Sequence, residues 1–251
     1  MFAETAPSTS NYARDTVSSL IVPESTMTRT ANARLAGFTF LAYIATGIAS
    51  MILFAQASVG ASDTARLTSI AQHGTTVRLT AVLTLLTFFE AVILGVTLYA
   101  LTRDEDRDIA VLALCCRAAE GVLGATSAVR TMQLLSVATA ITTASDAATA
   151  TALGTSLLGL GGSSTVISAT CFAVGSTLFS YLFLRARSIP VPLAWLGVLA
   201  SVLLVIALPV QLAGFLPDSL AWPIWLPMLA FEVTLAVWLM VKGVTVAAQT
   251  P

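Results

Sequence analysis

The chain contains six apolar runs, each long enough to cross a lipid bilayer as an α-helix. About 20 helical residues, at about 1.5 Å each, span a hydrocarbon core of about 30 Å. Because only helices and closed barrels satisfy their backbone hydrogen bonds inside lipid, the sequence predicts an all-α membrane protein with six transmembrane helices in one bundle. We place the runs at residues 35–56, 79–102, 109–138, 165–184, 192–215 and 222–241.

The composition supports a membrane protein and argues against nucleic acid as a partner. Of the 251 residues, 57% are hydrophobic and only 10% are charged, whereas an average soluble domain has about 25% charged residues. The net charge of -1 provides no basic surface, so the lipid bilayer is the partner that the sequence predicts. Cys115, Cys116 and Cys171 fall in apolar runs without metal-ligand spacing, and we expect reduced packing residues. No feature specifies an oligomeric state.

The segments outside the apolar runs predict the domain organisation. Residues 1–33 are rich in Ser, Thr, Ala and Pro, and we expect a flexible cytoplasmic tail there. The transmembrane domain covers residues 34–243, and residues 244–251 form a short C-terminal tail. Residues 139–163 are small and weakly polar, so we expect a loop that ends at a helix breaker, Gly159–Ser163, before the fourth span.

The basic residues in the short connections predict the orientation. Cytoplasmic loops of membrane proteins carry an excess of Lys and Arg. With the N-terminus inside, the outer side keeps only Arg66 and, at its rim, Arg78. We therefore expect a multi-pass protein of the cytoplasmic (inner) membrane with both termini in the cytoplasm. The inner side then collects Arg14, Arg29, Arg34, Arg103, Arg107, Arg185, Arg187 and Lys242.

Ionisable residues within the apolar runs are the candidate site: Glu90, Arg117, Glu120 and Glu232. A charge in hydrocarbon is costly, so such residues face the bundle interior and pair with one another. At about 1.5 Å per residue from the cytoplasmic helix ends, Arg117, Glu232, Glu120 and Glu90 lie at depths of about 12, 15, 16 and 18 Å. The sequence predicts one layer near the membrane midplane in which Arg117 contacts a carboxylate, and we favour Glu232 because that contact joins the two halves of the chain.

The layer has two interpretations. Three ionised carboxylates around one guanidinium would leave two excess negative charges, so at least one carboxyl, Glu120 or Glu90, holds a proton or is matched by a cation. This interpretation favours a membrane protein that binds a small molecule, an ion or a proton in the layer. The alternative is a non-catalytic structural or partner-binding protein whose buried charges only fix helix packing.

We predict no cofactor, metal site or catalytic residue. His73 is the only histidine, which excludes helical bis-histidine haem ligation. No lysine lies within a span, which excludes a retinal-type Schiff base. No nucleophile and base are visible at helical spacing, so the sequence favours a protein that is not an enzyme.

Three stretches resemble a known family. They are Arg117-x-x-Glu120, the segment Gly175–Phe183 that runs into Arg185–Pro190, and the closing segment Phe231–Gly243. Together they are similar to the bacterial integral membrane family called domain of unknown function 4386, over residues 29–243. The resemblance implies the membrane fold and the buried charges. Because the family has no assigned activity, it implies no chemistry.

Overall fold

The computed structural model describes residues 28–141 and 147–244 of the chain. Within these residues, six helical segments are long and apolar enough to cross a membrane, which confirms the predicted all-α fold class. Of the predicted tails, residues 1–27 and 245–251 lie outside the described residues. The elements are α2 (Arg29–Ala57), α3 (Asp63–Gln72), α4 (Gly74–Thr102), α5 (Arg107–Ile141), α6 (Ala147–Ala186), α7 (Val191–Leu212), α8 (Asp218–Ala221), the 3-10 helix η1 (Pro223–Trp225) and α9 (Leu226–Val241). Residues 29–33, which we expected in the flexible tail, are instead the first residues of α2.

Polar side chains fix where several helices begin. The hydroxyl of Thr28 accepts a hydrogen bond from the amide of Ala31 at 3.2 Å, and a carboxylate oxygen of Asp106 accepts one from the amide of Ile109 at 3.2 Å. Such side chains satisfy amide groups that have no partner in the first turn of a helix. Because Thr28 caps α2, the helix begins ahead of the apolar run that we placed at Leu35.

The start of α6 differs most from the prediction. We expected residues 139–163 to form a loop that ends at Gly159–Ser163. Instead, α5 continues to Ile141, and α6 begins at Ala147 and passes through the glycines without a break. The predicted helix breaker is therefore wrong.

Two glycines of α6, Gly154 and Gly161, serve packing instead. A Cβ atom on Gly154 would lie 2.7 Å from Cδ1 of Leu67 in α3, and one on Gly161 would collide with Nη1 of Arg130 in α5. Small residues in a helix let side chains of neighbouring helices approach its backbone. These two glycines therefore let α3 and α5 pack closely against α6.

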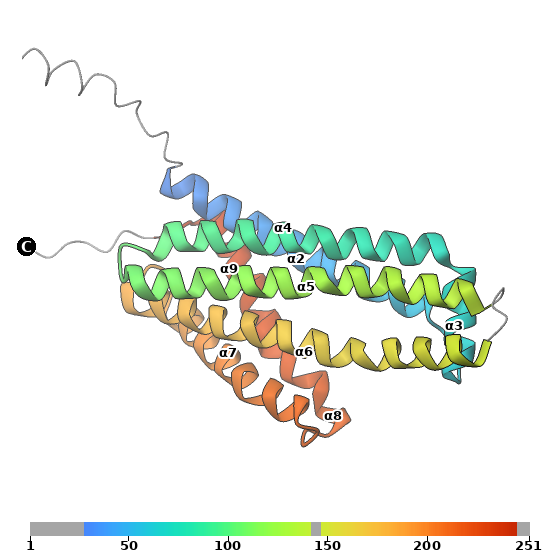
Figure 1. The fold of residues 1–251 in the computed structure, drawn as a ribbon. Coiled ribbons are helices and arrows are strands. Elements are labelled where there is room, and N and C mark those ends of the chain that lie inside the picture. Colours follow the sequence, from blue (N-terminus) through green and yellow to red (C-terminus); the bar gives the residue numbers. More distant parts are fainter. Residues whose placement is uncertain (1–27, 142–146, 245–251) are drawn as a thin grey trace, which may run out of the picture.

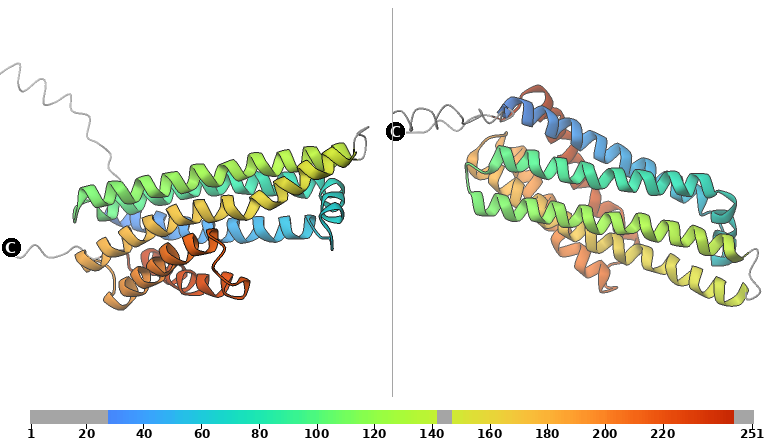
Figure 2. Two further views of the ribbon diagram at one scale, coloured as in Figure 1. Left: turned by 60° about the horizontal axis from the view of Figure 1, so that its bottom comes forward. Right: turned by 45° about the horizontal axis from the view of Figure 1, so that its top comes forward.

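The helices differ in length, and this gives the bundle two distinct ends. In Figure 1, α4, α5 and α6 run side by side, and α3 lies across one end of them, which we call the α3 end. The views in Figure 2 show that α7, α8 and α9 stop well short of this end. At about 1.5 Å per residue, α5 and α6 are about 52 and 60 Å long, whereas the hydrocarbon core is about 30 Å thick. The α3 end therefore projects beyond the bilayer.

The opposite end carries the charged turns and marks the other membrane surface. Nε of Arg185, at the end of α6, lies 2.8 Å from a carboxylate oxygen of Glu105, and its Nη1 lies 3.3 Å from one of Asp106. Arg29, at the start of α2, pairs with Asp104 at 3.3 Å. These exposed ion pairs join α2 and α6 to the turn between α4 and α5, and we call this the turn end.

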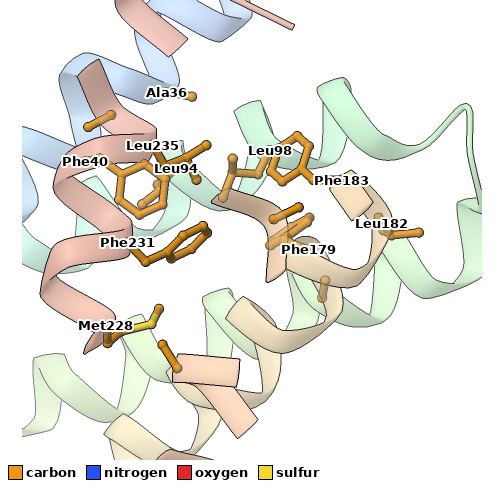
Figure 3. Packing of buried hydrophobic residues seen from close by; sticks show 14 of the residues in the cluster. Ala36, Phe40, Leu94, Leu98, Phe179, Leu182, Phe183, Met228, Phe231 and Leu235 are labelled. Carbon is orange, nitrogen blue, oxygen red and sulfur yellow. The ribbon is translucent and has the colours of Figure 1, made fainter. Parts of the chain in front are cut away.

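The bundle has two apolar cores, a main core and a smaller one at the α3 end. The main core joins α2, α4, α5, α6, α7 and α9, and Figure 3 shows the aromatic rings of Phe40, Phe179, Phe183 and Phe231 within it. A second cluster lies at the α3 end, so the projecting part is packed in its own right. Its buried members are Ala57, Leu67, Ile70, Val77, Leu134, Leu135 and Ala138.

The cysteines are free thiols, as expected, but not all of them are packing residues. Cys115 is exposed, whereas Cys116 and Cys171 are half-buried. Since α5 presents Cys115 outward on a span, this thiol faces lipid.

Candidate functional site

Arg117 is the centre of the candidate site. It lies in α5, about 15 Å from the start of the helix, and only 1% of its surface is exposed. Its guanidinium carbon lies 5.4 Å from the ring centre of Tyr43 and 5.1 Å from that of Phe172. Aromatic faces attract a cation, and this attraction grows when both are removed from water. The two rings, from α2 and α6, therefore hold the charge between helices.

Close helix packing fixes the stem of Arg117 as well. A Cβ atom on Gly95 of α4 would lie 3.0 Å from Cβ of Arg117, and one on Gly175 of α6 would lie 3.4 Å from its Cδ. Glycine at both positions lets α4 and α6 approach the side chain from two sides. The sequence thus fits two neighbouring helices around one arginine.

Glu120 is the ion-pair partner of Arg117. Nη1 of Arg117 lies 2.7 Å from Oε2 of Glu120, but the N–H direction misses the carboxylate. None of the three guanidinium nitrogens makes a hydrogen bond to the described residues. The contact is therefore an ion pair without hydrogen-bond geometry, and the buried donors of Arg117 are left unsatisfied by the protein.

Glu120 is also bound to α2. The Tyr43 hydroxyl donates a hydrogen bond of 2.5 Å to Oε1 of Glu120. The backbone oxygen of Glu120 accepts a further hydrogen bond of 2.9 Å from the hydroxyl of Ser168 in α6. One residue of α5 thus connects to both α2 and α6.

Glu232 lies in the same centre but without an ion pair. It is buried in α9 and is within electrostatic range of Arg117 and Glu120. Its Oε1 is buried and has no hydrogen-bond partner among the described residues. Our preference for an Arg117–Glu232 pair is wrong, because the ion pair forms with Glu120. Residues three apart share a helix face, so α5 provides its own counter-charge.

Glu90 is buried but lies apart from this centre. Its Oε1 accepts a hydrogen bond of 3.1 Å from the hydroxyl of Thr46 in α2, and its Oε2 has no partner in the described part of the chain. No ion pair of the described residues joins it to Arg117. We therefore treat Glu90 separately from the three-residue group of Arg117, Glu120 and Glu232, which we call the midplane centre.

The contribution of α2 to the site was not predicted from the sequence. Tyr43 and Thr46 each bind one of the buried carboxylates, and Ser50 lies 3.2 Å from the hydroxyl of Thr84 in α4. Tyr43, Thr46 and Ser50 are three and four residues apart, so they share one helix face. A polar stripe within an apolar run is the sequence signal that could have identified these three residues.

The space at the midplane centre is small. A cavity of about 10 Å³ lies beside Arg117, with the serines Ser176 and Ser180 in its wall. This volume holds about one water molecule. The rest of the cavity wall is apolar and includes Phe40, Phe179 and Phe231 of the main core. Within the described residues, no group of three or more metal-ligating side chains is present.

Comparisons with known proteins identify a family and no individual relative. Neither the curated proteins nor the solved structures give a match to the chain. A protein-family model with the description "Domain of unknown function (DUF4386)" matches residues 35–243, which includes all six spans and every residue of the midplane centre. The chain therefore belongs to the family called domain of unknown function 4386.

Proposed function

We propose that this multi-pass protein binds an exchangeable proton at the midplane centre and that Glu232 carries it. The observation behind the proposal is that two buried carboxyls share one buried guanidinium. If both were ionised, the centre would hold one excess negative charge in a low dielectric, which is costly. Glu120 has an ion pair and a phenol hydrogen bond, whereas Glu232 has neither within the described part of the chain. The neutral form therefore belongs to Glu232.

The size of the cavity favours a proton over a larger ligand. Small-molecule sites enclose about 300 to 1,000 Å³, and the cavity beside Arg117 has about 10 Å³. A proton needs no such space. We further propose that the protein lies in the cytoplasmic (inner) membrane with both termini inside, on the basis of the basic residues in its loops.

The alternative function is structural. Two rings and two glycines fix the position of Arg117. A fixed side chain suits a buried charge whose role is only to set helix packing. In that case Glu232 keeps one protonation state and never exchanges its proton.

Infrared spectroscopy distinguishes the two functions. We would record the carboxylic acid C=O stretch of the protein in neutral lipid nanodiscs across a pH series, for the wild type and Glu232→Gln. The proposal expects a protonated carboxyl band that varies with pH in the wild type and is missing in Glu232→Gln. Glu90→Gln is the matched control, since it removes another buried carboxyl outside the midplane centre and must leave this band in place. A band that persists in Glu232→Gln, or one that never responds to pH, overturns the proposal.

A further inference from the structure

A second, much larger cavity lies toward the α3 end of the bundle. Its volume is about 430 Å³, within the range of small-molecule sites. Arg130, in its wall, is about 20 Å along α5 from Arg117, so this cavity is separate from the midplane centre. It lies where α7 and η1 end against the longer α5 and α6. The polar side chains in its wall are Arg66, Arg130, Thr165 and Gln211.

Arg130 is a cation without a counter-charge. Its Nη1 donates a long hydrogen bond of 3.4 Å to the backbone oxygen of Leu157, and its Nε is buried without a partner among the described residues. No ion pair of the described residues includes it. Since Gly161 leaves room for this guanidinium against α6, the helix is shaped to hold the charge at the cavity wall.

Arg66 adds a second positive charge that is only loosely matched. It lies 3.8 Å from Asp63 within α3, and its side chain is 37% exposed. Among the side chains that the structure describes, two guanidinium groups and one carboxylate leave an excess positive charge around the cavity. Guanidinium groups bind carboxylates and phosphates through paired N–H donors, so the fitting ligand carries such an anionic group.

The apolar part of the cavity wall indicates what kind of molecule carries the anionic group. Phe54, Leu134, Val166 and Trp225 supply an apolar lining, and the volume exceeds what a bare inorganic anion fills. Arg130 lies about 35 Å along α5 from the turn end, which is near the opposite membrane surface. Trp side chains also prefer this interface level, as Trp225 does here.

We propose that this cavity binds an anionic amphiphile, with a phosphate or carboxylate head at Arg130 and Arg66 and an apolar chain against the Trp225 wall. The proposal is independent of proton binding at the midplane centre. A lipid of the surrounding bilayer and a soluble amphiphilic anion share this chemistry, and the experiment separates them.

The test measures binding of dodecyl phosphate to the full chain in phosphatidylcholine nanodiscs. Loss of a charge-assisted hydrogen bond weakens binding by about tenfold or more, so Arg130→Gln should show at least this loss. Arg78→Gln is the matched control, because Arg78 is an exposed arginine of α4 outside the cavity wall. The affinity of Arg78→Gln for dodecyl phosphate should stay within about twofold of the wild-type value, since exposed charges are screened.

A second pair of variants leaves the charge unchanged. Gly161→Ala pushes the guanidinium of Arg130 from its place, whereas Gly159→Ala adds a Cβ with nothing within 4 Å. Only the first should weaken binding. This pair also decides the matter if Arg130→Gln does not fold. If phosphatidylglycerol added to the nanodisc competes with dodecyl phosphate, the natural ligand is a bilayer lipid. If it does not compete, the natural ligand is a soluble anion. No binding by the wild type, or equal losses within either pair, overturns the proposal.

Discussion

The hydroxyl of Tyr43 in α2 donates a hydrogen bond to the Glu120 carboxylate in α5, the same carboxylate that pairs with Arg117. One turn further along α2, Thr46 binds Glu90 of α4. Lipid gives helices little hydrophobic reason to associate, so packing and interhelical hydrogen bonds must hold them together. The polar stripe of α2 is therefore what attaches the first span to the bundle at midplane.

The first prediction concerns this stripe. Tyr43→Phe removes the phenol hydroxyl and keeps the ring that faces Arg117. We expect the free energy of unfolding to fall by about 1 to 2 kcal/mol, since a hydrogen bond to a charged group is lost within the membrane. Unfolding in mixed micelles by a denaturing detergent would measure it. Tyr99→Phe, at a hydroxyl with no hydrogen bond to the described residues, is the control, and equal losses in both variants would contradict the prediction.

The second prediction concerns the ion pair itself. Arg117→Met leaves two buried carboxyls without a cation, and we expect a loss of about 3 to 5 kcal/mol in unfolding free energy. The double change Arg117→Met with Glu120→Met removes both charges of the pair, so it should cost less than the sum of the two single changes.

A double-mutant cycle in the same unfolding assay checks this coupling. The corresponding cycle with Glu232 in place of Glu120 should give a smaller interaction energy, because Glu232 makes no ion pair with Arg117. If the Glu232 cycle gives the larger coupling, the pairing in the structure is contradicted.

The spans and the burial of the charges were predictable from sequence, because both follow from the cost of charge in lipid. Length and apolarity alone place each span, and a charge within a span has to face the interior. The choice of partner was not predictable. It depends on how each helix is rotated about its axis, and depth estimates contain no information on rotation. Glu232 and Glu120 have nearly the same depth, yet only Glu120 pairs with Arg117.

The continuation of α6 through its glycines was unpredictable for a related reason. Gly161 weakens a helix in isolation, and its benefit appears only when Arg130 of α5 is placed against it. The value of glycine at this position depends on a contact between α5 and α6, and local sequence does not specify that contact.

The third prediction concerns orientation. The excess of basic residues at the turn end predicts that this end is cytoplasmic. A fluorescent reporter that folds only in the cytoplasm should be active when fused after Asp104 and inactive when fused after Phe215. Alkaline phosphatase, which folds only outside, should give the opposite pattern at the same two sites. The reverse result for both reporters would invert the topology.

The last prediction concerns the contact between the first and last spans. A Cβ atom on Gly37 of α2 would lie 2.5 Å from the backbone oxygen of Ala236 in α9, and a backbone group cannot move aside as a flexible side chain can. Gly37→Ala must therefore separate the two helices, and we expect a loss of about 1 to 3 kcal/mol in unfolding free energy, as for other overpacked sites. Gly47 lies in the same helix with nothing within 4 Å of an added Cβ. Gly47→Ala should be neutral or slightly stabilising, by up to about 1 kcal/mol, because alanine favours the helix. Unfolding of the two variants under identical detergent conditions provides the comparison. Equal effects would show that α2 and α9 do not approach each other closely at Gly37.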